Sequence, residues 1–221
     1  MTDRAAGRQD VDLRVVLFSA PGGQLRVALV RDGGALRLPR GVPRPAHGID
    51  AEARRVLREQ TGCIDQYIEQ LCTLGAESER RWTVVVAYLA LVASDEPALD
   101  APGCEWRPAG DSPDLSAADR MVLDYALVRL RAKIGYSTIA FRLLPPVFTL
   151  RELQDVYEAI LGHPVDKRNF RRRVAAAAPI EATGQRRRDG SHRPAELYRY
   201  RGDRAAETYL TPPWAAGGQQ V

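Results

Sequence analysis

The residues with the clearest chemical potential are basic side chains near the carboxyl end of the sequence. Between residues 165 and 201, eleven basic residues stand against four acidic ones, a net charge of +7. The whole chain of 221 residues carries only +4, so the remainder carries −3. A slightly acidic body with a strongly basic segment is the charge distribution expected of a protein that binds a polyanion.

Residues 166–174 have the composition of a helix that contacts DNA. Phe170 and Val174 lie four residues apart and can anchor one face of the helix, which Asp166 is placed to cap. The basic side chains then point outward, where arginine can pair with guanine and asparagine with adenine in a major groove. A solvated face is the usual explanation of a charge run, but this run is almost one-signed and follows a helix and a turn. The predicted contacts are Lys167, Arg168, Asn169, Arg171, Arg172 and Arg173.

A second basic cluster follows in a stretch rich in glycine and aspartate. It includes Arg187, Arg188, His192 and Arg193. We expect this cluster to form the tip of a wing that reaches backbone phosphates or the minor groove. Thr149, at the start of an earlier helix, is a further candidate, because its backbone amide can donate to a phosphate. As a plain N-cap it needs no DNA.

The elements that must position these residues have the order of a winged helix-turn-helix. A capping box at Thr149 and Glu152 opens a helix over 150–161, which Gly162 ends. The basic helix covers 167–177, and strands over 180–183 and 196–200 can pair as a hairpin. A short helix is expected before them, over 136–144. Helix, turn, basic helix and hairpin together predict a DNA-binding unit.

The strings FTLRELQDVYE and DKRNFRR in this region are similar to the winged-helix half of the Nudix-related transcriptional regulators, the NrtR family. The resemblance covers residues 136–201. It implies a homodimer that binds double-stranded DNA at a palindromic operator and represses genes of NAD biosynthesis or salvage. It also implies that ADP-ribose or a related NAD metabolite is the small nucleotide effector that releases DNA.

The sequence of the amino-terminal half predicts a sheet and one short helix. Strands are expected over 13–19 and 25–30 around a Pro-Gly-Gly turn, with a short third strand over 35–38. The continuously apolar run over 82–92 predicts a central strand, with Trp82 packed in the core. A helix is expected over 51–61, capped by Asp50 and ended by Gly62.

A longer helix is expected from Ser116, its cap, to Ile134. Its apolar face is predicted to be Met121, Leu123, Ala126, Leu127 and Leu130. Lys133 in its last turn is expected to be an ordinary solvated cation. This helix leads from the amino-terminal half into the DNA-binding unit.

The segment from Gly41 to Cys63 resembles the Nudix box, G-x5-E-x7-R-E-U-x-E-E-x-G-U, in which U is apolar. The matching residues are Gly41, Arg55, Leu57, Glu59 and Gly62. Three of the four glutamates are absent, because His47, Val56 and Gln60 stand in their places. The resemblance covers residues 11–134 and implies a Nudix-like α/β/α sandwich.

The missing glutamates decide what this domain can do. Active members of the Nudix family use clustered carboxylates to hold divalent cations that polarise a pyrophosphate. Mg²⁺ requires anionic oxygen ligands, and Glu59 alone cannot supply them. We therefore expect no catalysis, no metal site and no required cofactor. The alternative is a hydrolase with residual activity on nucleoside diphosphates of the ADP-ribose type.

A degenerate box can still retain a nucleotide cleft. The candidate ligand-binding residues are Arg37, Arg40, Gly41, Arg55, Arg58, Glu59 and Arg81. A scaffold ion pair is an equally good role for Arg55, and loop bracing is one for Glu59, whereas His47 is expected in an exposed loop. Because the box does not define the base or sugar pocket, a sugar or another nucleotide remains an alternative effector.

The sequence as a whole predicts an α+β chain with two domains. They are a degenerate Nudix-like ligand-sensing domain over 11–135 and a winged helix-turn-helix domain over 136–207, between flexible termini at 1–10 and 208–221. No apolar run could span a bilayer, and the first ten residues are no signal peptide. The expected location is the bacterial cytoplasm, at the nucleoid through operator binding.

Overall fold

The computed structural model describes residues 10–45, 47–64, 66–78, 81–95, 99–110, 115–177, 179–188 and 194–202. Within them the chain divides into two compact units. The first contains 10–18, 27–91 and 99–126, and the second contains 19–26, 92–95 and 127–202. The predicted flexible termini lie outside the described residues, except Asp10, which begins the first strand. None of the described helices is long and apolar enough to cross a membrane.

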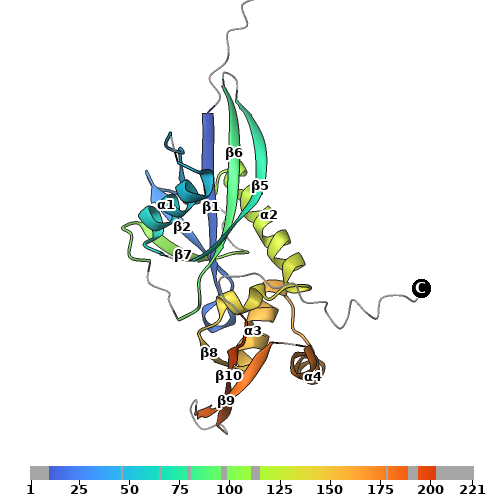
Figure 1. Ribbon diagram of the computed structural model, residues 1–221. Helices are drawn as coiled ribbons and strands as arrows, with labels where there is room; N and C mark the ends of the chain where they lie inside the picture. Colours follow the sequence, from blue (N-terminus) through green and yellow to red (C-terminus); the bar gives the residue numbers. More distant parts are fainter. Residues whose placement is uncertain are drawn as a thin grey trace, which may run out of the picture. The chain divides into compact units, whose positions relative to one another are not determined.

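In the described residues, seven strands form one mixed sheet (Figure 1). They are β1 (Asp10–Ser19), β2 (Arg26–Asp32), β3 (Ala35–Arg37), β4 (Arg40–Gly41), β5 (Tyr67–Ser78), β6 (Arg81–Leu91) and β7 (Cys104–Pro108). The order is β3-β2-β1-β6-β5, with β4 paired to β1 and β7 paired to β2. β1 and β6 run parallel, whereas β5 is antiparallel to β6.

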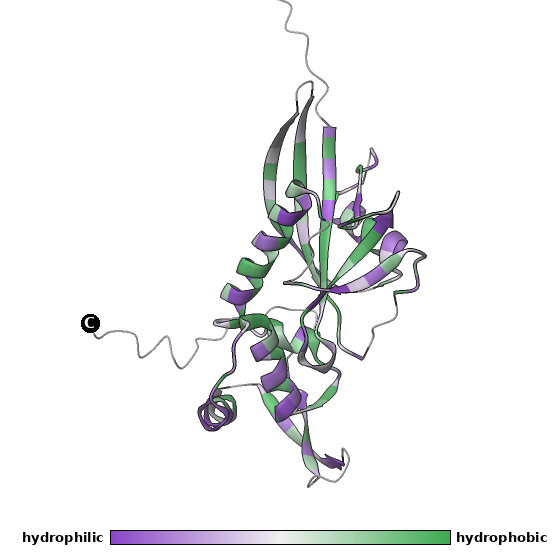
Figure 2. Ribbon diagram, turned by 180° about the vertical axis from the view of Figure 1, so that it is seen from behind, coloured by the Kyte–Doolittle hydropathy of each residue, from purple (hydrophilic) through white to green (hydrophobic). Residues whose placement is uncertain are grey.

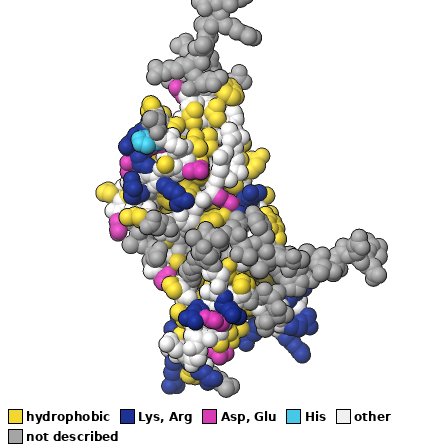
Figure 3. All heavy atoms as spheres, in the orientation of Figure 1, with side chains coloured by type: hydrophobic (Ala, Val, Ile, Leu, Met, Phe, Trp, Pro, Cys, Tyr) yellow, Lys and Arg dark blue, Asp and Glu magenta, His cyan; other side chains and the backbone are white. Residues whose placement is uncertain are grey.

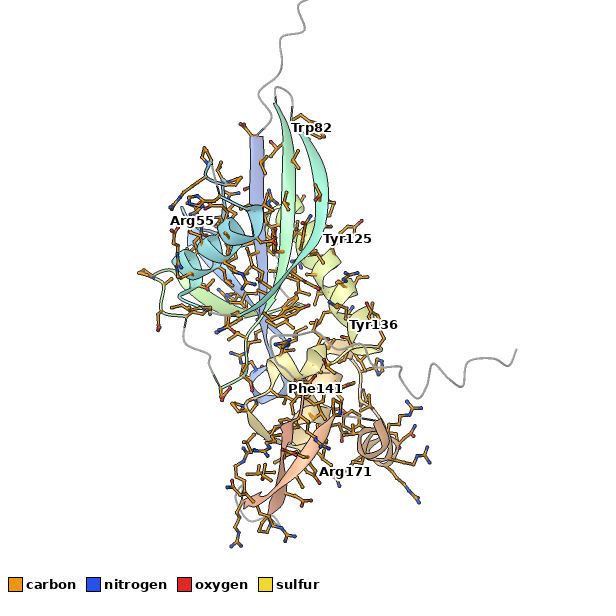
Figure 4. The ribbon with its side chains drawn as sticks, in the orientation of Figure 1. Arg55, Trp82, Tyr125, Tyr136, Phe141 and Arg171 are labelled. Carbon is orange, nitrogen blue, oxygen red and sulfur yellow. The ribbon has the colours of Figure 1, made fainter. Side chains whose placement is uncertain are left out.

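The predicted strand over 82–92 is confirmed as β6, between β1 and β5. It is apolar because both of its faces are covered, and Val85 to Leu91 are buried. The core prediction for Trp82 is wrong, since this side chain is 49% exposed. The ring of Trp82, labelled in Figure 4, lies next to Gly75 of β5. Because glycine has no side chain, Gly75 does not cover the ring. The edge strand β5 was not predicted, because a bulge between Gln70 and Cys72 breaks the alternation of its faces.

Two helices pack on this sheet, and both correct sequence predictions. Helix α1 (Ile49–Thr61) ends at Gly62, as expected, with a φ of 80°. Its N-cap is Gly48 rather than Asp50. Asp50 lies in the first turn and accepts a hydrogen bond from the hydroxyl of Tyr88 on β6 at 2.5 Å. Burial, together with this bond, raises the pKa of Tyr88.

Helix α2 (Ala117–Ile134) begins as predicted, since the Ser116 side chain accepts a hydrogen bond from the backbone amide of Asp119 at 3.1 Å. Its buried face includes Val122, Leu123, Ala126, Leu127 and Leu130. Met121 was assigned to that face but is 45% exposed. Lys133 is not solvated, since it is only 1% exposed. The backbone amides of Tyr136 and Ser137 donate to its carbonyl at the end of α2.

A buried ion pair joins α2 to β1. Arg14 Nη1 lies 3.0 Å from Asp119 Oδ1, and the side chains are 9% and 1% exposed. Arg14 Nε also donates to Asp12 at 3.0 Å. Charges removed from water in this way are tolerated only when they are paired, so this contact fixes where α2 begins on the sheet.

The second unit has the predicted winged-helix order. Its elements are η1 (Pro21–Gly23), η2 (Ile139–Leu143), β8 (Val147–Thr149), α3 (Leu150–Leu161), α4 (Lys167–Ala177), β9 (Ile180–Arg187) and β10 (Ala195–Tyr200). The helix expected over 136–144 is the short 3₁₀ turn η2, and the predicted hairpin is longer than expected. β8 was not predicted and pairs with β10, in a sheet of order β8-β10-β9.

Aromatic side chains build the core of the second unit. The ring of Phe141 stacks on that of Tyr200, with centroids 4.6 Å apart, and is tilted against Phe148. Two connecting segments also belong to this unit: η1 packs on α3, and the amide of Ser94 donates to Leu143. The second half of α2 belongs to this unit as well. The boundary between the two units therefore lies within α2, whereas the sequence predicted it at residue 135.

Candidate nucleic-acid interface and the face of helix α1

Helix α4 presents a basic side to solvent. Phe170 and Val174 are buried at 8% exposure each. Arg168 and Arg172 lie on the opposite side of the helix and are exposed, as are Lys167, Arg171 and Arg173. Figure 2 shows the hydrophilic colour of α4, and Figure 3 shows dark blue side chains there and at the β9–β10 hairpin. The predicted orientation of this helix is therefore confirmed.

The buried side of α4 is fixed to α3. The rings of Phe170 and Tyr157 meet edge to face, with centroids 5.2 Å apart. The backbone amide of Asn169 donates to the Asp166 carboxylate at 2.7 Å, which confirms Asp166 as the cap. Burial raises the pKa of Tyr157 to about 12, so its ring stays neutral in this contact.

A carboxylate clamp closes the turn between the two helices. Glu158 Oε1 accepts hydrogen bonds from Gln154 Nε2 at 2.9 Å and from the backbone amide of Val165 at 3.0 Å. These bonds lower the pKa of Glu158. Because Val165 immediately precedes the cap of α4, the clamp sets the point at which the basic helix begins. Glu158 was not among the residues predicted from the sequence to have a role.

Replacing Glu158 with alanine is expected to destabilise the protein by about 1–2 kcal/mol, since it leaves the Val165 amide without its acceptor. A carboxyl group whose pKa is lower in the folded protein than in the unfolded chain stabilises the folded state at pH values above its unfolded-state pKa. The contribution is lost as the pH falls through the lowered pKa of Glu158. Urea unfolding from pH 7 down to pH 3 should therefore show the two proteins converging in acid. A difference that stayed constant with pH would contradict the charged clamp.

The wing carries basic residues of two kinds. Arg186 and Arg188 are exposed. Arg187 Nη2 instead donates to Glu152 Oε1 at 2.6 Å, which ties β9 to the start of α3. The predicted residues His192 and Arg193 lie outside the described residues.

Two other predicted DNA contacts are engaged within the protein. The backbone amide of Thr149 donates to Glu152 Oε2 at 2.7 Å, and Thr149 is only 4% exposed. Thr149 is thus the N-cap of a complete capping box, and its amide is not available to a phosphate in this arrangement. The side-chain oxygen of Asn169 accepts a hydrogen bond from Arg172 at 2.8 Å. Arg171 lies on the side of α4 toward β10 (Figure 4).

In the first unit, Arg55 on α1 is saturated by carboxylates. Its Nε and Nη2 donate to Glu52 Oε2 at 2.9 and 2.7 Å, and its Nη1 donates to Glu59 Oε2 at 2.7 Å. Nη2 also donates to the carbonyl of Val42. Hydrogen bonding to Arg55 lowers the pKa of Glu52, so the pair is charged. Arg55 is therefore part of a scaffold of ion pairs on α1 (Figure 4).

Glu52 is a residue that the sequence analysis missed. It is 3% exposed, and its carboxylate accepts the backbone amide of Arg44 at 3.0 Å besides the bonds from Arg55. Its spacing to Arg55, three residues along a helix, was the available indication of an ion pair. Arg44 also donates to Glu59 at 3.2 Å, so Glu59 braces the loop before α1. His47 is exposed, as expected, 3.6 Å from Glu52.

The substituted box positions have structural roles. Gln60 accepts hydrogen bonds from Arg37 Nη1 at 3.0 Å and from the amide of Arg40 at 3.2 Å, and donates to the Arg40 carbonyl at 2.5 Å. Val56 is fully buried, and a Cβ on Gly41 would lie 2.9 Å from its Cγ2. Gly41 is thus required for close packing.

This donor set does not fit a hard divalent cation. The two carboxylates on this face of α1, Glu52 and Glu59, are both bonded to Arg55, and Val56 offers hydrocarbon. The described residues contain no group of three or more potential metal ligands. Of the arginines predicted to bind a ligand, those with exposed side chains in the described residues are Arg40, 3.9 Å from Asp32, and Arg58. Arg37 is held by Asp32 at 2.9 Å, and the side chain of Arg81 lies outside the description.

Residues 140–200 match the NrtR DNA-binding winged helix domain. Over 84% of this chain and 80% of the relative, the chain is 34% identical to the ADPR responsive transcriptional repressor NtrR of Acinetobacter baylyi. The crystal structure of Shewanella oneidensis NrtR complexed with a 27mer DNA is 33% identical, with a TM-score of 0.76 over 86% of this chain and 93% of that one.

Shewanella oneidensis NrtR without DNA gives similar values, 32% identity and a TM-score of 0.77 over 91% of this chain and 98% of that one. A Nudix family protein from Enterococcus faecalis shares the fold at 20% identity and a TM-score of 0.71, covering 90% of this chain and 89% of that one. The α+β architecture of a Nudix-like unit with a winged helix is thus the predicted one. From its sequence and its fold, the chain belongs to the NrtR family of transcriptional regulators.

Proposed function

We propose that this chain is a dimeric transcriptional repressor that binds double-stranded DNA through α4 and the wing of β9 and β10. The basic side of α4, fixed to α3 by Phe170 and Tyr157, is the observation that carries the proposal. A second support is the Shewanella relative, which was crystallised with DNA. Two copies of α4 related by a two-fold axis fit a palindromic operator. The proposed targets are genes of NAD biosynthesis or salvage, at the nucleoid in the bacterial cytoplasm.

The proposed effector is ADP-ribose or a related NAD metabolite, bound by the first unit. The support is the ADP-ribose response in the name of the Acinetobacter relative. The proposed contacts are Arg40, Gly41, Arg58 and Arg81, with Arg37, Arg55 and Glu59 as the frame that holds them. Release of DNA requires only that the effector bind more tightly to a dimer geometry that does not match the operator.

Fluorescence anisotropy with a labelled duplex tests this proposal. Palindromic duplexes are first recovered by in vitro selection from a random library with the full-length protein. We expect tight binding that weakens steeply with salt and a rise in Kd on adding ADP-ribose. NAD, ATP and ribose serve as matched additions that identify the effector class. Equal affinity for selected and scrambled duplexes would overturn a sequence-specific repressor.

We also propose that α1 does not catalyse hydrolysis, because its carboxylates are committed to Arg55. The competing function is residual cleavage of ADP-ribose. Incubation of the protein with ADP-ribose and Mg²⁺ or Mn²⁺ should release no more AMP than the same mixture with EDTA. AMP release that scales with protein concentration and stops with EDTA would favour the hydrolase.

A further inference from the structure

An apolar stripe runs along the exposed side of α2. Met121, Tyr125 and Val128 are 45%, 51% and 64% exposed. Their spacing of four and three residues places them on one face of the helix, and the exposed Ala132 follows four residues later. Figure 4 shows Tyr125 on the outward side of α2. All of these residues lie within the single helix α2, so the stripe is formed by one element.

The stripe has no role in the core of the protein. The opposite face of α2 is already buried through Val122, Leu123 and Leu130. Elsewhere in the described residues, the exposed large apolar side chains are Val42, Ile64 and Trp82, which lie in separate segments. Single exposed apolar residues are ordinary, whereas several on one helix face mark an interaction surface.

The pattern of the stripe and its charges fits a second copy of the same helix. The alternating spacing of four and three from Met121 to Ala132 is that of a coiled-coil seam. Asp124 and Arg129 are exposed and border the seam on opposite sides. In a parallel two-fold pair, Asp124 of one copy faces Arg129 of the partner subunit, five residues further along. The charges beside the seam of one copy are thus complementary to those of the other copy.

We propose that two copies of this chain associate through the Met121–Tyr125–Val128 stripe of α2, packed in parallel about a two-fold axis. The inference rests on the proposed function for the existence of a dimer, and it adds where the two copies meet. Met121 and Tyr125 belong to the first compact unit and Val128 to the second, so both units contribute residues to this interface.

Val128→Glu in the full-length protein tests the interface, because it puts a carboxylate in an apolar seam. Light scattering after size-exclusion chromatography should give the monomer mass at concentrations where the wild type is a dimer. The circular dichroism spectrum should be unchanged, since the side chain is exposed. Ile64→Glu is the matched control, at 61% exposure outside α2, and should remain a dimer.

The outcomes separate this inference from the proposed function. A dimeric wild type with dimeric Val128→Glu and Tyr125→Glu proteins would overturn the interface and leave the repressor standing. A monomeric wild type would instead remove the dimer from the proposed function itself. Asp124→Arg should raise the dimer dissociation constant at least about 10-fold, and adding Arg129→Asp should restore it. Failure of that restoration would contradict the parallel pairing.

Discussion

Replacing both Arg168 and Arg172 with alanine is expected to weaken binding to the selected palindromic duplex by roughly 100-fold or more. These two side chains lie opposite the buried Phe170 and Val174, so they are the part of α4 that reaches furthest from its own unit. A bidentate arginine contact to guanine is worth about 1–3 kcal/mol, and each protomer loses two such groups. Anisotropy titrations at fixed salt measure the loss.

A matched pair of arginines separates base recognition from charge alone. Arg199 and Arg201 lie in and directly after β10 and both pair with Glu181 on β9. Their double replacement with alanine removes the same charge and should change affinity by only a few fold. If Arg168→Ala with Arg172→Ala left affinity at the wild-type value, α4 would not be the helix that enters the groove.

Asp119→Ala is expected to lower the free energy of unfolding by about 3 kcal/mol. The change leaves Arg14 buried without the closest partner of its Nη1, and an uncompensated buried charge costs about 3–5 kcal/mol. Asp12, which also pairs with Arg14, places the effect at the lower end of that range. For a chain of this size the melting temperature should fall by roughly 10 °C. Thermal unfolding followed by circular dichroism measures it.

An exposed pair of the same type is the control for Asp119. Asp32 accepts a hydrogen bond from Arg37 at 2.9 Å but is 57% exposed, so Asp32→Ala should cost less than about 1 kcal/mol. Replacing the buried pair together, with Arg14→Met and Asp119→Leu, should recover much of the stability, because no charge is then left alone. Equal losses for Asp119→Ala and Asp32→Ala would show that burial of the pair has no energetic consequence.

Local signals in the sequence determined the winged-helix order and the helix ends other than the start of α1. The capping box of Thr149 and Glu152, the Asp166 cap and the left-handed glycines after α1 and α3 are confirmed. Each depends on backbone groups within about one helical turn of the residue concerned, so sequence neighbours suffice to predict it. The anchoring of Phe170 also followed from helical spacing.

Contacts between distant segments were beyond such reasoning. Strand β8 exists because β10, almost fifty residues later, pairs with it. Met121 and Trp82 have apolar side chains, and only the packing of α2 and of the β5–β6 hairpin decided that both are exposed. Lys133 has the opposite outcome, since a charged side chain expected in solvent is 1% exposed in the folded protein.

The basic segment and the missing glutamates were visible in the amino-acid types alone, and they led to the expectations of DNA binding and of a non-catalytic domain. Only the tertiary structure decided which charges remain available. Arg55 was a predicted ligand contact and Arg187 a predicted DNA contact, but they bind Glu52 and Glu152, whereas Arg168 and Arg172 remain exposed. The physical reason is that an arginine pairs with a carboxylate that the fold brings within hydrogen-bond reach. Helical spacing can indicate the contact of Arg55 with Glu52, but only the tertiary structure brings Arg187 to Glu152, 35 residues earlier.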